Sequence, residues 1–281
     1  METRSISGAG AVEVLNVDLN NLSNQQTSGI LDLYRENVAM VFRDQNLSPD
    51  SQLRFTELFG PVMSHPLRTR ATPEGYPQIL ILENRPGLRG APNDYWHSDI
   101  SHSETPPSAT VLHSLTVPQG YGDTLVCNMV RAYEQLSEPV RKMVENLRAL
   151  HSGLPTYERS VALSTDARKI DPSEVKPPYS HPVVRAVEGT DQKAIFINPR
   201  FTTAIEGVDK DVSDFLMRHL IDKATRPENV YRHQWRPGDV LLWDNRRTMH
   251  YAVLDYSEDM PRKMHRATAG GENPQDAVKA A

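Results

Sequence analysis

The first sixty residues of the chain predict short strands that alternate with amphipathic helices. The two predicted strands are an alternating apolar and polar segment and a short apolar run, and apolar side chains at helical spacing lie between them. These strands cover residues 11–17 and 38–42, and the helix covers residues 26–37. Ser48 is a suitable N-cap for a second helix, with Pro49 at its first position and Gly60 after its end.

From residue 78 onward the pattern changes to short strands separated by turn residues, of which Arg236-Pro237-Gly238-Asp239 is the clearest turn. The predicted strands cover residues 79–83, 109–115, 123–128, 183–187, 193–198, 231–235 and 239–243. Two amphipathic helices, residues 130–149 and 210–224, interrupt them. Many short strands with few helices predict an α+β, mainly β protein with a closed or two-sheet core.

A polar segment over residues 152–181 has little periodicity. A loop of that length within a compact domain is usually functional or disordered, so we interpret it as a lid over a site. We expect the rest of residues 1–281 to form a single domain around that site.

Composition and charge exclude several classes of protein. The 281 residues carry a formal net charge of −5, which argues against a basic nucleic-acid-binding surface. A single cysteine, Cys127, excludes an intrachain disulfide and fits a reducing compartment. We find no secretory signal pattern at the N-terminus and no apolar stretch long enough to span a membrane. The sequence therefore predicts a cytoplasmic protein, with no membrane or nucleic-acid partner, and leaves a homo-oligomer open.

Two segments far apart in the chain predict a metal site. His97 and Asp99 are two residues apart on an extended segment, so their side chains point to the same side. His250 follows a turn at the end of the predicted strand 239–243. Two histidines and one carboxylate leave up to three positions open on an octahedral metal, which suits a non-haem iron(II) oxygenase. The same three ligands also suit catalytic zinc.

Arg262, shortly after His250, favours iron over zinc. A dicarboxylate co-substrate must be anchored by its far carboxylate, and the planar fork of an arginine matches that group. A zinc hydrolase has no need of such an arginine.

An ordered set of short stretches resembles the taurine catabolism dioxygenase family of Fe(II)/2-oxoglutarate enzymes. The resemblance runs from about Val38 to Thr268. The matching stretches are Trp96-His97-Ser98-Asp99, Glu104-Thr105-Pro106-Pro107, Gly122-Asp123-Thr124, His181-Pro182-Val183-Val184-Arg185, Trp243-Asp244-Asn245-Arg246, His250-Tyr251-Ala252, Asp255-Tyr256 and Met264-His265-Arg266-Ala267-Thr268. The resemblance implies a double-stranded β-helix, or jelly-roll, core with flanking helices and with iron at one mouth.

The resemblance also implies roles for individual residues. His97, Asp99 and His250 match the metal ligands, and Thr124 and Arg262 match the residues that bind the distal carboxylate of 2-oxoglutarate. Asn93 and Arg266 match positions that contact substrate in the family's taurine dioxygenase. This chain has Arg70 near the position where that enzyme has a substrate-contacting histidine, and the lid segment also diverges.

The expected activity is the hydroxylation of an unactivated C–H bond of a small, anionic or polar organic substrate. Fe(II), 2-oxoglutarate and O2 would take part, and succinate and CO2 would be released. Two alternatives stay open at this point. One is a non-catalytic jelly-roll protein that binds or senses a metal, and the other is a metal-dependent hydrolase or isomerase that uses the same three ligands.

Overall fold

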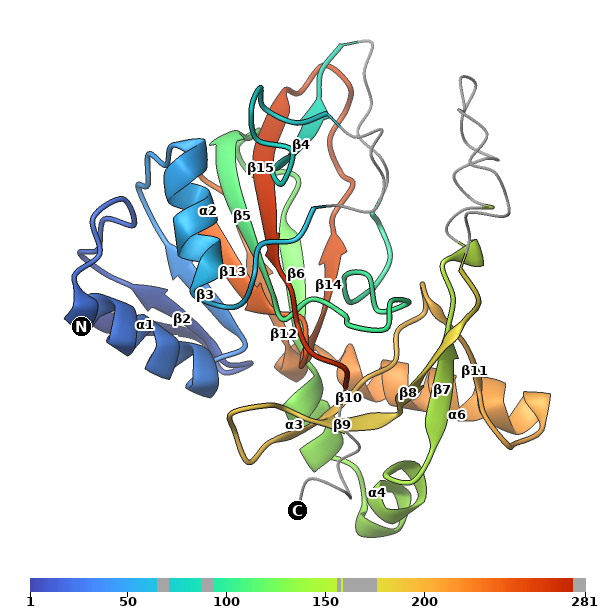
Figure 1. Ribbon diagram of the computed structural model, residues 1–281. Helices are drawn as coiled ribbons and strands as arrows, with labels where there is room; N and C mark the ends of the chain where they lie inside the picture. The colour runs from blue at the N-terminus through green and yellow to red at the C-terminus, as the bar shows by residue number, and fades with distance from the viewer. Residues whose placement is uncertain (65–70, 87–92, 156–157, 159–175, 275–281) are drawn as a thin grey trace.

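The largest element of the computed structural model is a seven-stranded sheet (Figure 1). Residues 1–64, 71–86, 93–155, 158 and 176–274 are described. The strands of the seven-stranded sheet, in spatial order, are β1 (Thr3–Ser7), β2 (Ala11–Val14), β3 (Ala39–Phe42), β13 (Val240–Asp244), β5 (Ala109–Thr116), β15 (Arg262–Ala269) and β4 (Leu80–Asn84). Neighbouring strands pair antiparallel except β2 and β3, which are parallel.

A second, three-stranded antiparallel sheet packs against the inner face of the first. Its order is β12 (Val230–His233), β6 (Thr124–Asn128) and β14 (Thr248–Ala252). Val126 and Tyr231 from this sheet and Leu112, Trp243 and Met264 from the large sheet belong to one buried apolar cluster. The two sheets therefore form a sandwich, as the sequence predicted for the core.

Two helices cover the outer face of the large sheet, α1 (Asn24–Glu36) and α2 (Pro49–Glu57) (Figure 1). The Ser23 hydroxyl accepts a hydrogen bond from Gln26, whose side chain bonds back to the Ser23 backbone, so a capping box begins α1. Ser48 caps α2 with Pro49 at its first position, which confirms the predicted start of that helix.

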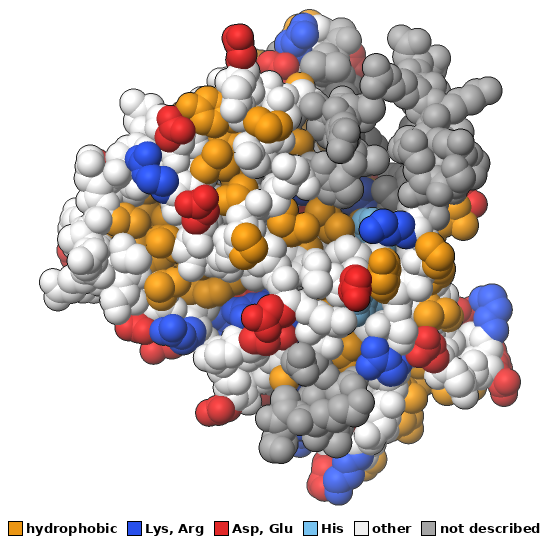
Figure 2. All heavy atoms as spheres, in the orientation of Figure 1, with side chains coloured by type: hydrophobic (Ala, Val, Ile, Leu, Met, Phe, Trp, Pro, Cys, Tyr) orange, Lys and Arg blue, Asp and Glu red, His pale blue; other side chains and the backbone are white. Residues whose placement is uncertain are grey.

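A third layer lies on the outer face of the small sheet. Cys127 and Met249 point into this layer and pack among apolar residues of its helices and short strands. Its members are α3 (Met129–Glu134), α4 (Glu138–Val144), β7 (Arg148–His151), β8 (Tyr179–Pro182), β9 (Val184–Ala186), β10 (Lys193–Ile195), β11 (Thr202–Ile205), α6 (Lys210–Ala224) and the 3-10 helix η2 (Pro227–Asn229). Lys, Arg, Asp and Glu side chains are interspersed over the face seen in Figure 2.

The structure corrects the prediction of one helix over residues 130–149. The segment forms α3 and α4, with a break before Pro139, and then the strand β7. Proline has no N–H to continue the helical hydrogen bonds but fits the first turn of a new helix. Most of the predicted lid lies outside the described residues, and its last part is the strand β8. No helix within the described ranges is long and apolar enough to cross a membrane.

Candidate metal centre

Strand alternation points several of the predicted site residues into the space between the two sheets. Side chains two residues apart on a strand lie on the same face. Val126 and Met264 belong to the core between the sheets, whereas Met249 belongs to the core outside the small sheet. This alternation assigns Thr124 on β6, His250 on β14, and Arg262 and Arg266 on β15 to the inner faces.

His97, Asp99 and His250 come together beside this space. Their ligand atoms all lie within 4.8 Å of one another. The backbone N–H groups of His97 and His250 each donate to the other residue's carbonyl, at 3.0 and 2.8 Å. These two hydrogen bonds hold the His97 segment beside β14. The Nε2 atoms of His97 and His250 lie 3.9 and 3.8 Å from Asp99 Oδ1. All three side chains are buried.

Asp99 is held by groups from three other strands or turns. The Thr110 hydroxyl on β5 donates to its Oδ2 at 2.7 Å, and Arg266 Nη1 on β15 lies 3.3 Å from its Oδ1. Asn245, in the turn after β13, in turn donates to the Thr110 oxygen at 2.9 Å. Burial would raise the pKa of Asp99, but Arg266, the two histidines and the Thr110 hydrogen bond together hold it well below its ordinary value.

The two histidines are neutral, as metal ligands must be. Burial lowers the pKa of His97 well below its ordinary value, and His250 and Arg200 lower it further. Burial, together with Arg266 and Arg200, lowers the pKa of His250 to about 4 although Asp99 opposes the shift. The Nδ1 atom of His97 lies 2.9 Å from the carbonyl of Tyr95. That contact places the ring proton on Nδ1, so the lone pair of Nε2 faces Asp99 and His250.

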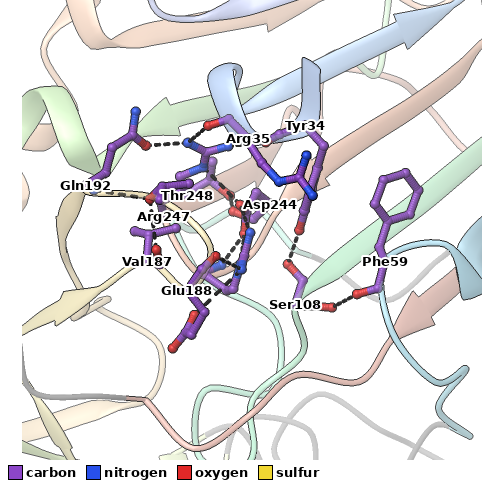
Figure 3. A network of polar contacts seen from close by, with 12 residues as sticks. Tyr34, Arg35, Phe59, Ser108, Val187, Glu188, Gln192, Asp244, Arg247 and Thr248 are labelled. Atoms are coloured by element: carbon purple, nitrogen blue, oxygen red, sulfur yellow. Dashed lines mark hydrogen bonds and ion pairs between the residues drawn. The ribbon is translucent and has the colours of Figure 1, made fainter. Parts of the chain in front are cut away.

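A buried ion cluster fixes the turn between β13 and β14, the strand on which His250 lies (Figure 3). Arg246 makes two hydrogen bonds to the Asp244 carboxylate, at 2.9 and 2.8 Å, and Arg247 makes a third at 2.9 Å. Arg247 also donates to the carbonyls of Tyr34, Arg35 and Asn37 at the end of α1. The turn is therefore tied to the helical layer behind the large sheet.

Arg262 is a buried cation without a carboxylate partner among the described residues. Its side chain is 8% exposed, its Nε has no hydrogen-bond acceptor, and the ring of Tyr256 lies 5.8 Å from its guanidinium. Burial lowers its pKa. A Cβ added at Gly122, two residues before Thr124, would lie 3.2 Å from the Arg262 Nε. The segment that leads into β6 therefore borders the Arg262 side chain, and an anion is the natural partner for such a site.

The residues predicted to contact substrate have different surroundings. Arg266 lies against Asp99 itself, as described above. The Asn93 side-chain oxygen accepts a hydrogen bond from Arg200 at 3.1 Å, and the Arg200 guanidinium stacks over the ring of Tyr95 at 4.6 Å. The sequence analysis missed Arg200, because nothing in Asn198-Pro199-Arg200-Phe201 links that turn to the metal site. Arg70 lies outside the described residues.

The sequence profile described as "Taurine catabolism dioxygenase TauD, TfdA family" matches residues 2–268. The chain belongs to this family. It is 32% identical over 284 residues to an alkylsulfatase of Acinetobacter baylyi, covering 97% of this chain and 86% of the relative. It is 32% identical over 286 residues to an alpha-ketoglutarate-dependent sulfate ester dioxygenase of Pseudomonas putida, covering 98% and 91%. A crystal structure of a taurine dioxygenase from Burkholderia xenovorans superposes with a TM-score of 0.82 at 29% identity, covering 97% of this chain and 92% of that one.

Membership in the taurine catabolism dioxygenase family decides between the activities that the sequence left open. The chain is an Fe(II)- and 2-oxoglutarate-dependent dioxygenase that also consumes O2, and its core is the predicted jelly roll. The comparisons therefore support this activity over the metal sensor and the hydrolase or isomerase that the sequence left open.

Proposed function

We propose that His97, Asp99 and His250 hold the iron, and that Thr124 and Arg262 bind the distal carboxylate of 2-oxoglutarate. The convergence of two neutral imidazoles and one carboxylate within 4.8 Å carries the metal assignment, because this donor set suits iron(II) with open positions. When bound, the iron couples the oxidative decarboxylation of 2-oxoglutarate to the hydroxylation of an unactivated C–H bond. The chain's own residues orient both substrates and exclude water.

The burial of Arg262 supports its role as the 2-oxoglutarate anchor. Arg262 and Arg266 lie on one face of β15, about 13 Å apart along the strand at 3.3 Å per residue. Only Arg266 has a carboxylate partner among the described residues, and that partner is Asp99. The unpaired Arg262 is thus the cation available to a co-substrate that reaches away from the metal.

The substrate that we propose is a small organic anion such as an alkyl sulfate ester or sulfonate. Two relatives are named for sulfate esters or alkylsulfatase activity. Arg266 lies 3.3 Å from Asp99, so an anionic group that contacts this guanidinium would place a neighbouring C–H bond beside the metal. If the hydroxylated carbon also carries the sulfate oxygen, the product collapses to an aldehyde and releases sulfate.

Succinate release from 2-oxoglutarate, measured with a panel of alkyl sulfates, alkylsulfonates and the matching neutral alcohols, tests this proposal. We expect Arg266→Gln to raise the apparent KM of an active sulfate or sulfonate by about tenfold or more while uncoupled 2-oxoglutarate decarboxylation continues. Lys263→Gln, which removes a cation from the opposite face of the same strand, is the matched control. If the alcohols turn over as well as the anions in both the unmodified protein and Arg266→Gln, the anionic substrate class is wrong.

The cellular location and the assembly state stay predictions from the sequence. A cytoplasmic protein acting on a small molecule fits the proposed reaction, and size-exclusion chromatography with light scattering would measure whether the chain forms a homo-oligomer.

A further inference from the structure

Trp235 makes a buried hydrogen bond to the residue proposed to bind 2-oxoglutarate. The Trp235 Nε1 donates to the Thr124 Oγ1 at 3.0 Å, and both side chains are almost completely buried. Trp235 lies two residues after His233, which is the last residue of β12 and the cross-strand partner of Thr124 on β6. The pairing of β12 with β6 therefore brings the Trp235 and Thr124 side chains together.

The chemistry of the two groups fixes the direction of the hydrogen bond. An indole N–H can only donate, so the Thr124 oxygen must act as the acceptor. The hydroxyl hydrogen of Thr124 then remains for a different partner, and within the described part of the chain no group accepts it. Arg262, on the inner face of the large sheet, likewise offers only hydrogen-bond donors.

We propose that Trp235 is a positioning residue for 2-oxoglutarate, which holds the Thr124 hydroxyl as a donor toward the distal carboxylate. This inference rests on the proposed function, in which Thr124 and Arg262 bind that group. With Trp235 in place, one acceptor lone pair of the Thr124 hydroxyl is occupied, so its O–H and the Arg262 guanidinium are the donors offered to that carboxylate. Such a site selects an ionised carboxylate over a methyl or an amide group, because a methyl accepts no hydrogen bond and an amide brings its own donors.

The buried indole of Trp235 packs against the ring of His233. The His233 ring lies edge-on to the indole with centroids 4.3 Å apart and an interplanar angle of 85°. The Tyr231 hydroxyl lies 2.9 Å from the Nδ1 of His233, and the Asp239 carboxylate lies 3.2 Å from its Nε2. The Tyr231 contact is a hydrogen bond and the Asp239 carboxylate lies close to the other ring nitrogen, so buried polar groups flank the His233 ring that packs against Trp235.

The test removes the N–H and keeps an aromatic ring. In Trp235→Phe loaded with Mn(II) and kept without oxygen or primary substrate, we expect calorimetric titration to give a three- to tenfold weaker 2-oxoglutarate affinity, about the effect of losing one neutral hydrogen bond. In turnover, the preference for 2-oxoglutarate over 2-oxopentanoate, which lacks the distal carboxylate, should fall by the same factor. Activity with 2-oxopentanoate should stay unchanged.

A double-mutant cycle separates positioning from general packing. Thr124→Val should weaken 2-oxoglutarate binding, and adding Trp235→Phe to it should cause no further loss. Additive losses, or an equal loss for both 2-oxo acids, would overturn the role of Trp235. If Trp235→Phe does not fold, Trp235→Leu also removes the donor and is read in the same way.

The same titrations distinguish this inference from the proposed function. If Thr124→Val and Arg262→Gln both leave 2-oxoglutarate affinity unchanged, the co-substrate assignment itself fails. If both weaken it and the Trp235 variants do not, only the positioning role is lost.

Discussion

Asp99 is the residue on which the candidate site's hydrogen bonds and charges converge. It contacts a hydroxyl and a guanidinium, and two imidazoles lie within 4 Å of it. A buried carboxylate in such surroundings stays ionised, so it needs no deprotonation before it binds a cation. Thr110 orients the carboxylate, because its hydrogen bond occupies Oδ2 while Oδ1 faces the two histidines and Arg266.

Removing the Thr110 hydroxyl should weaken metal binding without removing a ligand. We expect Thr110→Val to lower the affinity for Fe(II) or Mn(II) by about tenfold or more, in the range typical of groups that orient metal ligands. Anaerobic metal titration measures the change. Thr110→Ser keeps the hydroxyl and should retain most of the affinity, and an equal loss in both variants would point to packing instead of the hydrogen bond.

The residues of the site differ in how far the sequence reveals them. His97 and Asp99 share a short motif, and His250 follows a predicted strand and turn, so their meeting could be predicted. Thr110, Arg200 and Trp235 could not be found in this way, because each acts through a partner that is distant in sequence and has no local signature. Asn245 lies in a stretch that resembles the family, but its contact with Thr110 is visible only in the structure. The left-handed backbone conformation of Ile100, with φ of 46°, could not be predicted from the sequence either, since a β-branched residue rarely adopts it.

At the scale of elements, the turn between β13 and β14 depends on the buried Asp244 cluster (Figure 3). Burial would raise the pKa of Asp244, but Arg246 and Arg247 outweigh it and hold the pKa below its ordinary value of 3.8. The carboxylate therefore stabilises the fold above pH 3.8, and this contribution is lost as the pH falls through the lower folded-state pKa.

We expect Asp244→Asn to lower the free energy of unfolding at pH 7 by about 3 kcal/mol. The buried Arg247 loses the carboxylate that pairs with it, and Arg246, which also lies 3.7 Å from Glu188, loses its closer partner. The difference between the unmodified protein and the variant should shrink below pH 3.8, where only the unmodified protein loses the charged form. Urea unfolding at pH 7 and at pH 3 measures both. The control is Asp32→Asn, which breaks an exposed ion pair to Arg35 on α1 and should change stability little. A difference that does not depend on pH would contradict the ionic explanation.

The sequence predicted elements best where one local pattern decides them. The helix α6 has the predicted bounds, residues 210–224, because its apolar stripe is uninterrupted. The predicted helix 130–149 was wrong because the apolar spacing continues through Pro139 into β7, whose strand character comes from pairing with β8 and β11. The strands β1, β11, β14 and β15 were also missed. β1 pairs with β2, the next strand along the chain, whereas the partners of the other three lie far away in the sequence.

At the scale of the whole molecule, the candidate site joins the two sheets of the jelly roll. Asp99 is bonded to the large sheet through Thr110, while His250 and Thr124 belong to the small sheet and Arg262 to the large one. A metal and a co-substrate bound there would contact both sheets at once. The pattern of the sequence predicted a two-sheet core, but which strands lie side by side follows from long-range pairing that no local pattern encodes.

This arrangement predicts that metal and 2-oxoglutarate stabilise the whole fold cooperatively. Without metal, Arg266 already compensates the charge of Asp99, so we expect the metal-free protein to be folded. A ligand that binds only the folded state at a hundred times its dissociation constant adds about 2.7 kcal/mol of stability. For a chain of this size that raises Tm by about 5 °C. Mn(II) without oxygen should give such a shift, and 2-oxoglutarate should add to it only when the metal is present.

Differential scanning calorimetry of three variants tests the assignment of each ligand. His250→Ala should abolish the shift caused by Mn(II) and with it the shift caused by 2-oxoglutarate. Arg262→Gln should keep the Mn(II) shift and lose most of the 2-oxoglutarate shift. His219→Ala, which removes a histidine from α6 far along the chain from the three candidate ligands, should retain both. If 2-oxoglutarate stabilises the metal-free protein as strongly as the loaded one, the co-substrate binds without the metal and the site does not join the two sheets as described.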